Sequence, residues 1–572
     1  MRREAVILFL AAAVLGATIT LWPQSRPASK KPTGAEQELS PAVSAAVRSI
    51  SGERMRAHVR FLASDLLEGR GTGQRGGDIV GEYIATQFAL MGLEPAGENG
   101  TYLQKVPLVG IKTQPETTFS IHPATGAAMD LTMLDDYVVM DETQNTESMV
   151  DADMVFVGYG IEAPEYGWND YQGMDVRGKV LLMLVNEPPS DDAKFFTGKA
   201  LTYYGRWTYK FEQAARKGAV GAVLVHKTEM ASYGWNVVRS SWSGERSRLR
   251  ADGTPLLKAA SWVQLEVARK ALAASGQDLD ALIEQAGSRN FRPVPLSLRL
   301  KARVVSKIRP FESSNVIGIV RGSDASMRRE AVLYTAHYDH LGVRPEQAGD
   351  SIYNGAEDNA TGCAVLLELA RAFGAAGEKP RRSILFAAVT AEEQGLLGSE
   401  YLGLHPPIPT ARITLNLNYD GIAPRGQPEQ LEVAGAERTS LFPVVQNTAR
   451  EFGLEIVPDS NPTAGYFYRS DHFSLARVGV PAFSVNEGLK FKDHTLEWGK
   501  AMRDEYTAKR YHQPSDEYRS EMDFSSGQTL ARFGLALGWK AATLRQSTAW
   551  RPGDEFEAAR KASLKAVEGS WE

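Results

Sequence analysis

The sequence has very little cysteine and no surplus of positive charge. Cys363 is the only cysteine in 572 residues, so an intramolecular disulfide is impossible. It lies in NATGCAVLLELA, an apolar helical pattern that predicts a small buried side chain rather than a thiol nucleophile. Lys and Arg number 64 against 69 Asp and Glu, which leaves no basic excess for binding a phosphate backbone. We therefore expect neither a disulfide framework nor a nucleic-acid partner.

The chain also lacks a nucleotide-binding loop. Its glycine-rich stretch EGRGTGQRGG, residues 68–77, has no GK[ST] ending and does not follow a predicted strand. Apolar residues at helical spacing lie on both sides of it, over residues 59–66 and 80–91. The pattern predicts two helices joined by this loop.

The N-terminus has a basic start and then about eighteen uncharged residues, in MRREAVILFLAAAVLGATITLW. This pattern predicts an export signal or a membrane anchor. No clear small-x-small cleavage site follows, so we slightly favour an N-terminal anchor over a cleaved signal. We expect the chain to be exported, with its bulk in the periplasm or another extracytoplasmic space.

The rest of the chain changes pattern several times, as expected of a sequence too long for one ordinary core. A Pro-, Ser- and Lys-containing linker ends near residue 40, and short Val-rich strands begin near residue 146. From about residue 291, apolar strands alternate with helices, as in SNVIGIV, AVLYTAHYD and SILFAAVTA. We predict an α/β fold with a mostly parallel twisted sheet flanked by helices and a β-rich inserted domain. The segment 549–572 is charged and predicts a solvated helical tail.

Polar side chains follow the buried runs of this predicted sheet, where ligands bind in open α/β folds. His337, Tyr338, Asp339 and His340 follow AVLYTA, Glu392 and Glu393 follow SILFAAVTA, and Asp420 follows ITLNLNY. Asp358 lies in NGAEDNATG before an apolar helix, and His512 lies in YHQPSDE.

Each of these residues has an ordinary explanation when it is taken alone. Asp358 could cap the helix that follows it, Asp420 could be a turn residue, and His512 could be a surface histidine. Several carboxylates at one sheet edge would, however, repel one another without a cation, and imidazole with carboxylate oxygen suits Zn²⁺. The set therefore indicates a metal site.

The five segments HYDH, NGAEDNATG, AEEQG, NLNYD and YHQPSDE resemble the signature segments of the co-catalytic two-zinc exopeptidases. That family includes bacterial leucyl-type aminopeptidases, glutamate carboxypeptidase and the non-enzymatic transferrin receptor. The resemblance covers about residues 310–545 and implies the phosphorylase/hydrolase-like zinc-exopeptidase fold. The stretch GYGIEAPEYGWNDYQGMDVRGKV resembles a protease-associated domain.

With this resemblance we divide the chain into five parts. They are a signal or anchor segment with linker (1–40), the first part of the zinc peptidase domain (41–145), a protease-associated-like insert (146–290), the main part of the peptidase domain (291–548) and the charged C-terminal tail (549–572).

The resemblance also implies a role for each matched residue. One zinc ion would be held by His337 and Asp420 and a second by Glu393 and His512. Asp358 would bridge the two ions. Two Zn²⁺ per chain are therefore the implied cofactors.

Further roles follow for residues beside these ligands. Glu392 would be the general base that takes a proton from the attacking water. Asp339 would steady the site without touching metal. His340 is treated as a neighbour of the metal ligands and not as a ligand. Either Tyr466 or Tyr468 would stabilise the oxyanion, and the alternative is that these aromatic side chains serve only in packing.

The implied function is hydrolysis of N-terminal residues from peptides by a metallo-aminopeptidase. A two-zinc carboxypeptidase is the alternative. Arg469 could bind the free carboxylate of such a substrate, or it could form only a surface salt bridge. An inactive binding or receptor relative is a third possibility, and single-zinc glutaminyl cyclisation a fourth. The complete ligand set with Glu392 argues against both of these. We also hypothesise that the aromatic-rich insert covers the catalytic cleft as a lid.

Overall fold

The computed structural model describes residues 38–568, except residues 193, 232, 346, 348 and 461. The predicted signal or anchor segment, apart from residues 38–40, lies outside the described residues. Within the described part of the chain, no helix is both long and apolar enough to cross a membrane. Leu39–Glu572 group together as one unit by their contacts, and the following paragraphs concern this unit.

A mostly parallel sheet forms the centre of the C-terminal half. Its strands lie in the order β21, β18, β14, β17 and β13. Strand β14 pairs in parallel with β17 and β18, and β18 pairs in parallel with β21, whereas β13 is antiparallel to β17. The strands are β13 (Val294–Val320), β14 (Ala331–His337), β17 (Ser383–Val389), β18 (Ile413–Asn418) and β21 (Ala482–Ser484).

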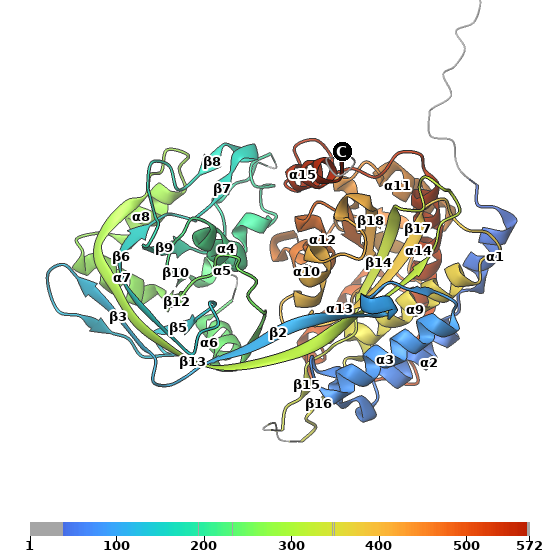
Figure 1. The fold of residues 1–572 in the computed structure, drawn as a ribbon, viewed down its shortest axis with the longest axis horizontal. Coiled ribbons are helices and arrows are strands. Elements are labelled where there is room, and N and C mark those ends of the chain that lie inside the picture. The colour runs from blue at the N-terminus through green and yellow to red at the C-terminus, as the bar shows by residue number, and fades with distance from the viewer. Residues whose placement is uncertain are drawn as a thin grey trace, which may run out of the picture. The chain divides into compact units, whose positions relative to one another are not determined.

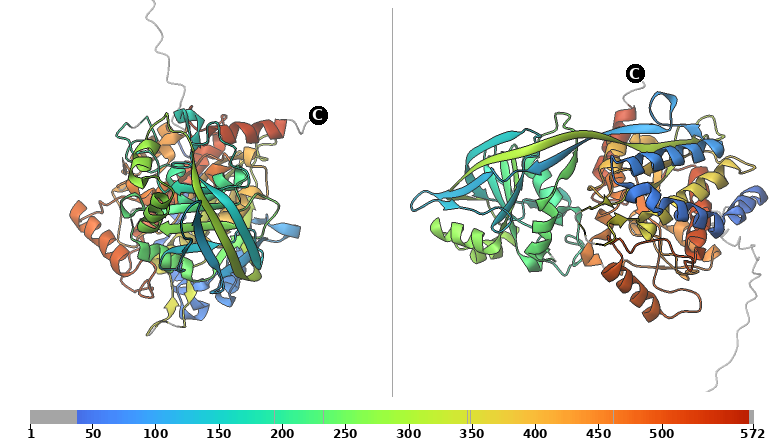
Figure 2. Two further views of the ribbon diagram at one scale, coloured as in Figure 1. Left: turned by 90° about the vertical axis from the view of Figure 1, so that its left-hand side faces the viewer. Right: turned by 90° about the horizontal axis from the view of Figure 1, so that it is seen from below.

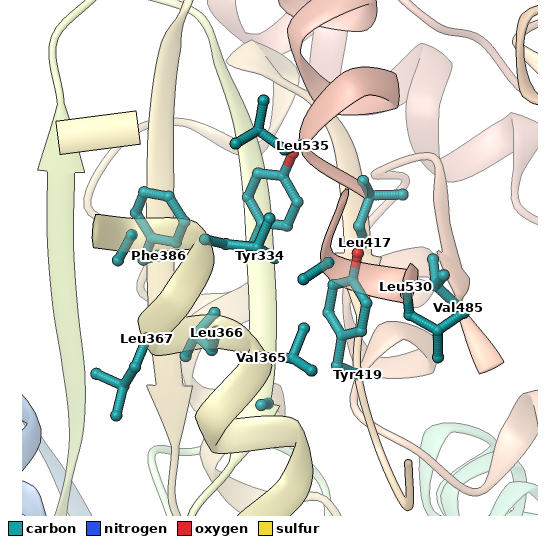
Figure 3. Packing of buried hydrophobic residues seen from close by; sticks show 14 of the residues in the cluster. Tyr334, Val365, Leu366, Leu367, Phe386, Leu417, Tyr419, Val485, Leu530 and Leu535 are labelled. Carbon is teal, nitrogen blue, oxygen red and sulfur yellow. The ribbon is translucent and has the colours of Figure 1, made fainter. Parts of the chain in front are cut away.

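Both faces of this sheet are covered, and accordingly every residue of β14, β17, β18 and β21 is buried. In β14, Val332, Tyr334 and Ala336 belong to one core, while Leu333 belongs to the core on the opposite face. Figure 3 shows side chains of α9 and α14 meeting those of the central strands on the first face. The helices of this face are α1 (Pro41–Ser49), α2 (Gly52–Leu62), α3 (Arg75–Leu90), α9 (Thr361–Gly374), α11 (Phe442–Glu451) and α14 (Ser525–Thr543). On the opposite face lie α10 (Leu397–Leu404) and α12 (His472–Arg477).

Strand β13 continues beyond this sheet into a second group of elements, with β2 (Leu103–Thr113) alongside it (Figures 1 and 2). The second group contains four parallel strands in the order β6, β9, β10 and β12, and β5 pairs with β12 in the antiparallel direction at the edge. Its strands are β3 (Thr118–Pro123), β5 (Tyr137–Met140), β6 (Glu147–Phe156), β9 (Val180–Leu184), β10 (Gly221–His226), β11 (Arg246–Leu249) and β12 (Ala259–Gln264). Its helices are α4 (Trp207–Arg216), α5 (Thr228–Ala231), α6 (Trp235–Ser243), α7 (Leu265–Ala274) and α8 (Leu279–Ala286).

Short strands and the C-terminal helices complete the unit. They are β1 (Glu94–Pro95), β4 (Met129–Asp130), β7 (Glu162–Ala163), β8 (Trp168–Asn169), β15 (Gly342–Val343), β16 (Ile352–Tyr353), β19 (Gln430–Glu432), β20 (Glu455–Val457), β22 (Asn486–Glu487), α13 (Leu496–Lys509) and α15 (Glu557–Glu568).

The core of the second group extends beyond the boundaries predicted for the insert. The sequence pattern places the insert at residues 146–290. A cluster of buried apolar residues in the second group begins earlier, at Phe119 and Ile121, and ends later, at Val304. The reason is that β3 and β5 pair with strands of this group, although they precede residue 146. The group also has helices packed on its sheet besides the predicted strands.

The C-terminal segment differs from the solvated tail that its charges predict. Trp550 and Phe556 are buried in the core that covers the second face of the central sheet. Arg438 forms ion pairs with Asp554 and Glu555, at 2.8 and 2.7 Å. Charge density alone is therefore a poor guide here, because two aromatic side chains anchor the segment.

A lysine without a hydrogen-bond partner is buried inside the second group. The Lys210 side chain is fully buried, and its Nζ contacts no acceptor among the described residues. Burial lowers the pKa of Lys210 to about 7, against the opposing charges of Asp170 and Glu187. Burial also raises the pKa of each of these two carboxyl groups to about 7.

Candidate metal and catalytic site

The predicted site residues lie where three neighbouring parallel strands end. His337 is the last residue of β14, and Glu392 and Asp420 follow β17 and β18 after short irregular segments. Parallel pairing of these strands brings their carboxyl ends to one edge of the sheet. The structure therefore collects the polar residues that the sequence analysis selected.

Asp358 lies between two imidazoles rather than capping a helix. Its Oδ1 is 3.3 Å from Nε2 of His337, and its Oδ2 is 3.2 Å from Nε2 of His512. The following helix, α9, has Ala360 at its N-cap and no side-chain cap. The capping explanation of Asp358 is therefore wrong, and its two oxygens face different histidines.

One group of candidate metal ligands surrounds His337. Its Nε2 is 3.1 Å from Oδ1 of Asp420, and Glu392 offers a carboxylate oxygen within the same small volume. Ser470 donates a hydrogen bond of 2.5 Å to Oδ2 of Asp420 and accepts one from Asn418. These contacts orient the Asp420 carboxylate toward His337.

A second group of candidate ligands surrounds Glu393. Its Oε2 is 3.2 Å from Nε2 of His512, and its Oε1 is 2.6 Å from Nδ1 of His340. Asp358 completes this group with His340 and Glu393. Glu393 thus faces two imidazoles, of which the sequence analysis assigned only His512 as a ligand.

The donor set of both groups fits zinc. Glu393 Oε1 and Nδ1 of His340 are buried and face each other at 2.6 Å without the geometry of a hydrogen bond, and Nε2 of His340 has no hydrogen-bond partner among the described residues. Buried polar atoms are normally paired, so convergent imidazole and carboxylate atoms without hydrogen bonds are suited to a cation. Two such groups, sharing Asp358 between His337 and His512, could hold two ions.

The ionisable groups of the site perturb one another strongly. Burial opposes the charged imidazole of His337, but Asp420 and Glu392 outweigh it and raise its pKa well above the usual range. Burial raises the pKa of Glu392 well above its ordinary value. For Asp358, burial is opposed by hydrogen bonds from His337 and His512, which hold its pKa well below the usual range. Such divergent shifts are typical of functional sites.

Asp339 supports the turn that carries Glu392. Its Oδ1 accepts a hydrogen bond of 3.1 Å from the Glu392 backbone N–H, and its Oδ2 accepts one of 2.9 Å from Thr72. Nδ1 of His337 is 3.9 Å from Oδ1 of Asp339 but 3.2 Å from its carbonyl oxygen. The Asp339 carboxylate therefore contacts the Glu392 turn, and the His337 ring contacts the Asp339 backbone.

Asp516 holds the segment that contains Asp358, and the sequence analysis did not select it. This carboxylate is buried and accepts hydrogen bonds from the backbone N–H groups of Glu357, at 3.1 and 3.2 Å, and Asp358, at 3.1 Å. The Tyr506 hydroxyl is 3.3 Å from it. Asp516 could have been selected from the sequence because it lies four residues after the predicted ligand His512, within the same segment YHQPSDE.

A pocket of about 720 Å³ opens beside Glu392, Glu393 and His512. Tyr511 also lines it, and its ring stacks on the ring of His512 with centroids 3.9 Å apart. Tyr468 donates a hydrogen bond of 2.7 Å to Glu555, which favours the packing role for this residue. Tyr466 is about half exposed and lies 5.8 Å from the Arg469 guanidinium.

Cys363 lies beneath this site. It is buried, and burial raises the pKa of its thiol to about 12. Its Sγ is 3.1 Å from the carbonyl oxygen of His337. The prediction of a small buried side chain at Cys363 is confirmed.

Comparison with known proteins finds similarity to peptidases over part of the chain. Residues 315–536 match the family model described as peptidase family M28. A probable zinc metalloprotease of Leptosphaeria maculans is 32% identical over 215 residues, covering 32% of this chain and 49% of that protein. Leupeptin-inactivating enzyme 1 of Streptomyces exfoliatus is 30% identical over 215 residues, covering 36% of this chain and 46% of that protein. The chain thus spans about half the length of these curated relatives.

One solved structure to which this chain is similar is an aminopeptidase from Aneurinibacillus sp. strain AM-1. It is 18% identical, the alignment covers 88% of this chain and 97% of that chain, and the TM-score is 0.48.

Proposed function

We propose, from the peptidase family M28 match of residues 315–536, that this chain is a zinc-dependent exopeptidase that removes N-terminal residues from peptides. The observation that carries the proposal is the position of Asp358, with one oxygen facing His337 and the other facing His512. A carboxylate placed in this way suits two neighbouring cations. His337 and Asp420 would hold one zinc ion, and Glu393 and His512 the other.

Glu392 is suited to be the general base of the reaction. It lines the pocket, and its backbone N–H is fixed by Asp339. It would accept a proton from the attacking water and return it to the leaving amine. Zinc, when bound, would lower the pKa of that water and polarise the scissile carbonyl. No covalent acyl-enzyme is required, which agrees with the buried, protonated state of Cys363.

The N-terminal direction of cleavage rests on the resemblance of the five segments to the signature segments of the family that includes the bacterial leucyl-type aminopeptidases. Carboxypeptidase action with the same residues is the second candidate, because arginine side chains line the pocket. We further propose that the chain acts after export, as its N-terminal sequence indicates. The aromatic-rich second group, which resembles a protease-associated domain, would restrict access to short peptides, since Trp207 and Phe211 line the same pocket as Glu392.

The test combines metal content with a substrate panel. Purified wild type, Glu392→Gln and the control Glu497→Gln would be compared by elemental analysis and by hydrolysis of peptides with free or blocked ends. Glu497 is an exposed carboxylate on α13. We expect about two zinc ions per chain in all three proteins and a loss of about 10²- to 10⁴-fold in hydrolysis only in Glu392→Gln.

Other outcomes would change the assignment. Cleavage of peptides with a blocked N-terminus and not of those with a blocked C-terminus would indicate a carboxypeptidase. Wild-type protein that holds no zinc and cleaves no peptide would be a binding protein. An active Glu392→Gln variant would exclude Glu392 as the base.

A further inference from the structure

Seven arginines line the pocket beside Glu392, against four carboxylates besides Glu392 and Glu393 of the proposed metal site. Three of its arginines have acidic partners: Arg477 lies 2.9 Å from Glu212, Arg216 lies 3.7 Å from the same carboxylate, and Arg248 lies 3.8 Å from Glu142. Arg477 also lies 3.6 Å from Glu400, so these pairs account for Glu212, Glu142 and Glu400. Positive charge remains elsewhere in the pocket.

Arg206, Arg246 and Arg469 also line the pocket, and none of them forms an ion pair with a described carboxylate within 4 Å. The surface salt bridge considered for Arg469 is therefore not formed among these residues. Arg206 lies just before α4 and Arg246 begins β11, whereas Arg469 follows the segment Tyr466–Tyr468. Two walls of the pocket thus contribute guanidinium groups.

These three guanidinium groups act on one common neighbour. Burial raises the pKa of the Tyr233 phenol, and the charges of Arg206, Arg469 and Arg246 oppose that rise. Three cations that act on one neighbour repel one another, and the carboxylates of Glu212 and Glu142 offset part of this repulsion at Arg206 and Arg246.

Two of the arginines are preorganised by their surroundings. The Arg246 guanidinium lies over the rings of Trp242 and Trp207, at 4.4 and 5.4 Å from their centroids. Arg206 has a buried Nε without a hydrogen-bond partner among the described residues. Burial lowers the pKa of Arg206 to about 10 and of Arg246 to about 9, and in each case a neighbouring arginine adds to the shift. Both groups remain protonated at neutral pH.

We propose that Arg206, Arg246 and Arg469 form a subsite that binds a carboxylate of the peptide substrate. The inference rests on the proposed function, because the subsite shares its pocket with Glu392 and Glu393. Planar guanidinium groups bind carboxylates through paired, charge-assisted hydrogen bonds, and the orphaned Arg206 Nε would gain an acceptor. The carboxylate is either the C-terminus of a short peptide or an Asp or Glu side chain.

The experiment uses the full chain and four peptides of one length with a free N-terminus. One has a free C-terminal carboxylate, the second is its C-terminal amide, and the other two are amides that differ by Asp in place of Asn. Each is assayed for kcat and KM with wild type, Arg246→Gln and Arg206→Gln. The control is Arg269→Gln, which removes an exposed arginine that is paired with Glu266 and Asp280 outside this pocket.

We expect wild type to prefer at least one carboxylate-bearing peptide over its neutral match by about 10- to 100-fold in kcat/KM, mainly through KM. The two peptide pairs distinguish a C-terminal from a side-chain carboxylate. The preference should fall in Arg246→Gln and Arg206→Gln and persist in Arg269→Gln. Equal cleavage of all four peptides by wild type would overturn the subsite, as would an unchanged preference in both pocket variants.

A binding measurement separates this inference from the proposed function. Calorimetric titration of the same peptides into Glu392→Gln does not depend on hydrolysis. If no protein cleaves any peptide but the carboxylate preference appears in binding and is lost on Arg246→Gln, the peptidase proposal fails and the subsite stands. If peptides are cleaved but bind without such a preference, the subsite fails and the peptidase proposal stands.

Discussion

Replacing Asp516 by Asn should weaken metal binding although Asp516 is not among the candidate ligands. Its carboxylate fixes the backbone N–H groups of Glu357 and Asp358, so it determines where the Asp358 side chain lies. Asn has nearly the same shape, but it replaces one acceptor oxygen by an NH₂ group that faces these donors. The variant therefore removes a positioning contact while the candidate ligands remain.

The size of the effect follows from the number of donors affected. Leaving one buried N–H without an acceptor costs about 1–3 kcal/mol, and Asn retains one oxygen that can serve the other donor. A loss of about 1–3 kcal/mol at Asp358 corresponds to about 5- to 150-fold in metal affinity. This range agrees with the 10- to 100-fold losses that are typical when groups supporting a metal ligand are changed.

The assay is zinc affinity by competition with a chromogenic chelator, together with the melting temperature. The control is Asp523→Asn, because Asp523 is exposed and accepts hydrogen bonds from Ser525 in the following helix. We expect affinity to fall in Asp516→Asn and not in Asp523→Asn. Unchanged zinc affinity in a folded Asp516→Asn protein would refute the reasoning, since Asp358 would then be held by other contacts.

Three further predictions concern other parts of the chain. Because the pKa of Lys210 is about 7 in the folded chain and 10.5 in the reference state, the unfolded chain holds the extra proton between these values. Stability should then rise with pH by up to about 1.4 kcal/mol per unit in this window, and urea unfolding at about pH 7.5 to 9.5 should show no such rise for Lys210→Met. Phe556→Ala should lower the free energy of unfolding by about 3–5 kcal/mol, whereas a change below about 1 kcal/mol would mean a solvated tail. His512→Ala should reduce the zinc content by about one ion per chain. If His512→Ala keeps its zinc and only His340→Ala loses an ion, His340 is the ligand in place of His512.

Much of the central fold could be predicted because its strands are buried on both faces. SILFAAV is apolar at all but its first position and ITLNLN has an apolar residue at every second position, and each is a fully buried strand of the central sheet. Since ligands in such folds lie beyond the carboxyl ends of the strands, the segments containing His337, Glu392 and Asp420 could be selected without a structure. Local sequence is informative here because the sheet topology brings consecutive strand ends together.

The boundary of the inserted part could not be predicted for a related physical reason. β13 runs from Val294 to Val320, far longer than an ordinary strand, and belongs to both groups of elements. Its first half alternates between buried and exposed residues, and its last residues are all buried. The sequence pattern predicts a boundary near residue 291, just before this strand begins, and so leaves in the peptidase domain the first part of β13, which pairs with β3 and β6 of the second group.

The contacts around Glu393 and the arginine group could not be predicted from spacing. His340 is three residues from His337 in one motif, yet it faces Glu393, whereas His337 faces Asp420. Arg206, Arg246 and Arg469 come from segments far apart in sequence, and each alone resembles a solvated surface charge. Only the folded arrangement shows that they share a pocket.

The family match covers all of the candidate metal ligands but only one of the three pocket arginines Arg206, Arg246 and Arg469. Residues 315–536 include Glu392 and all of the candidate ligands, so the match bears directly on the hydrolytic chemistry. They include Arg469 but neither Arg206 nor Arg246, which belong to the second group of elements. If those two arginines bind a substrate carboxylate, substrate choice depends on residues that the matched segment does not contain. Relatives aligned only over residues 315–536 would then share the hydrolytic reaction without sharing the preference for a substrate carboxylate. The change of that preference in Arg246→Gln measures how much of it comes from residues outside the matched segment.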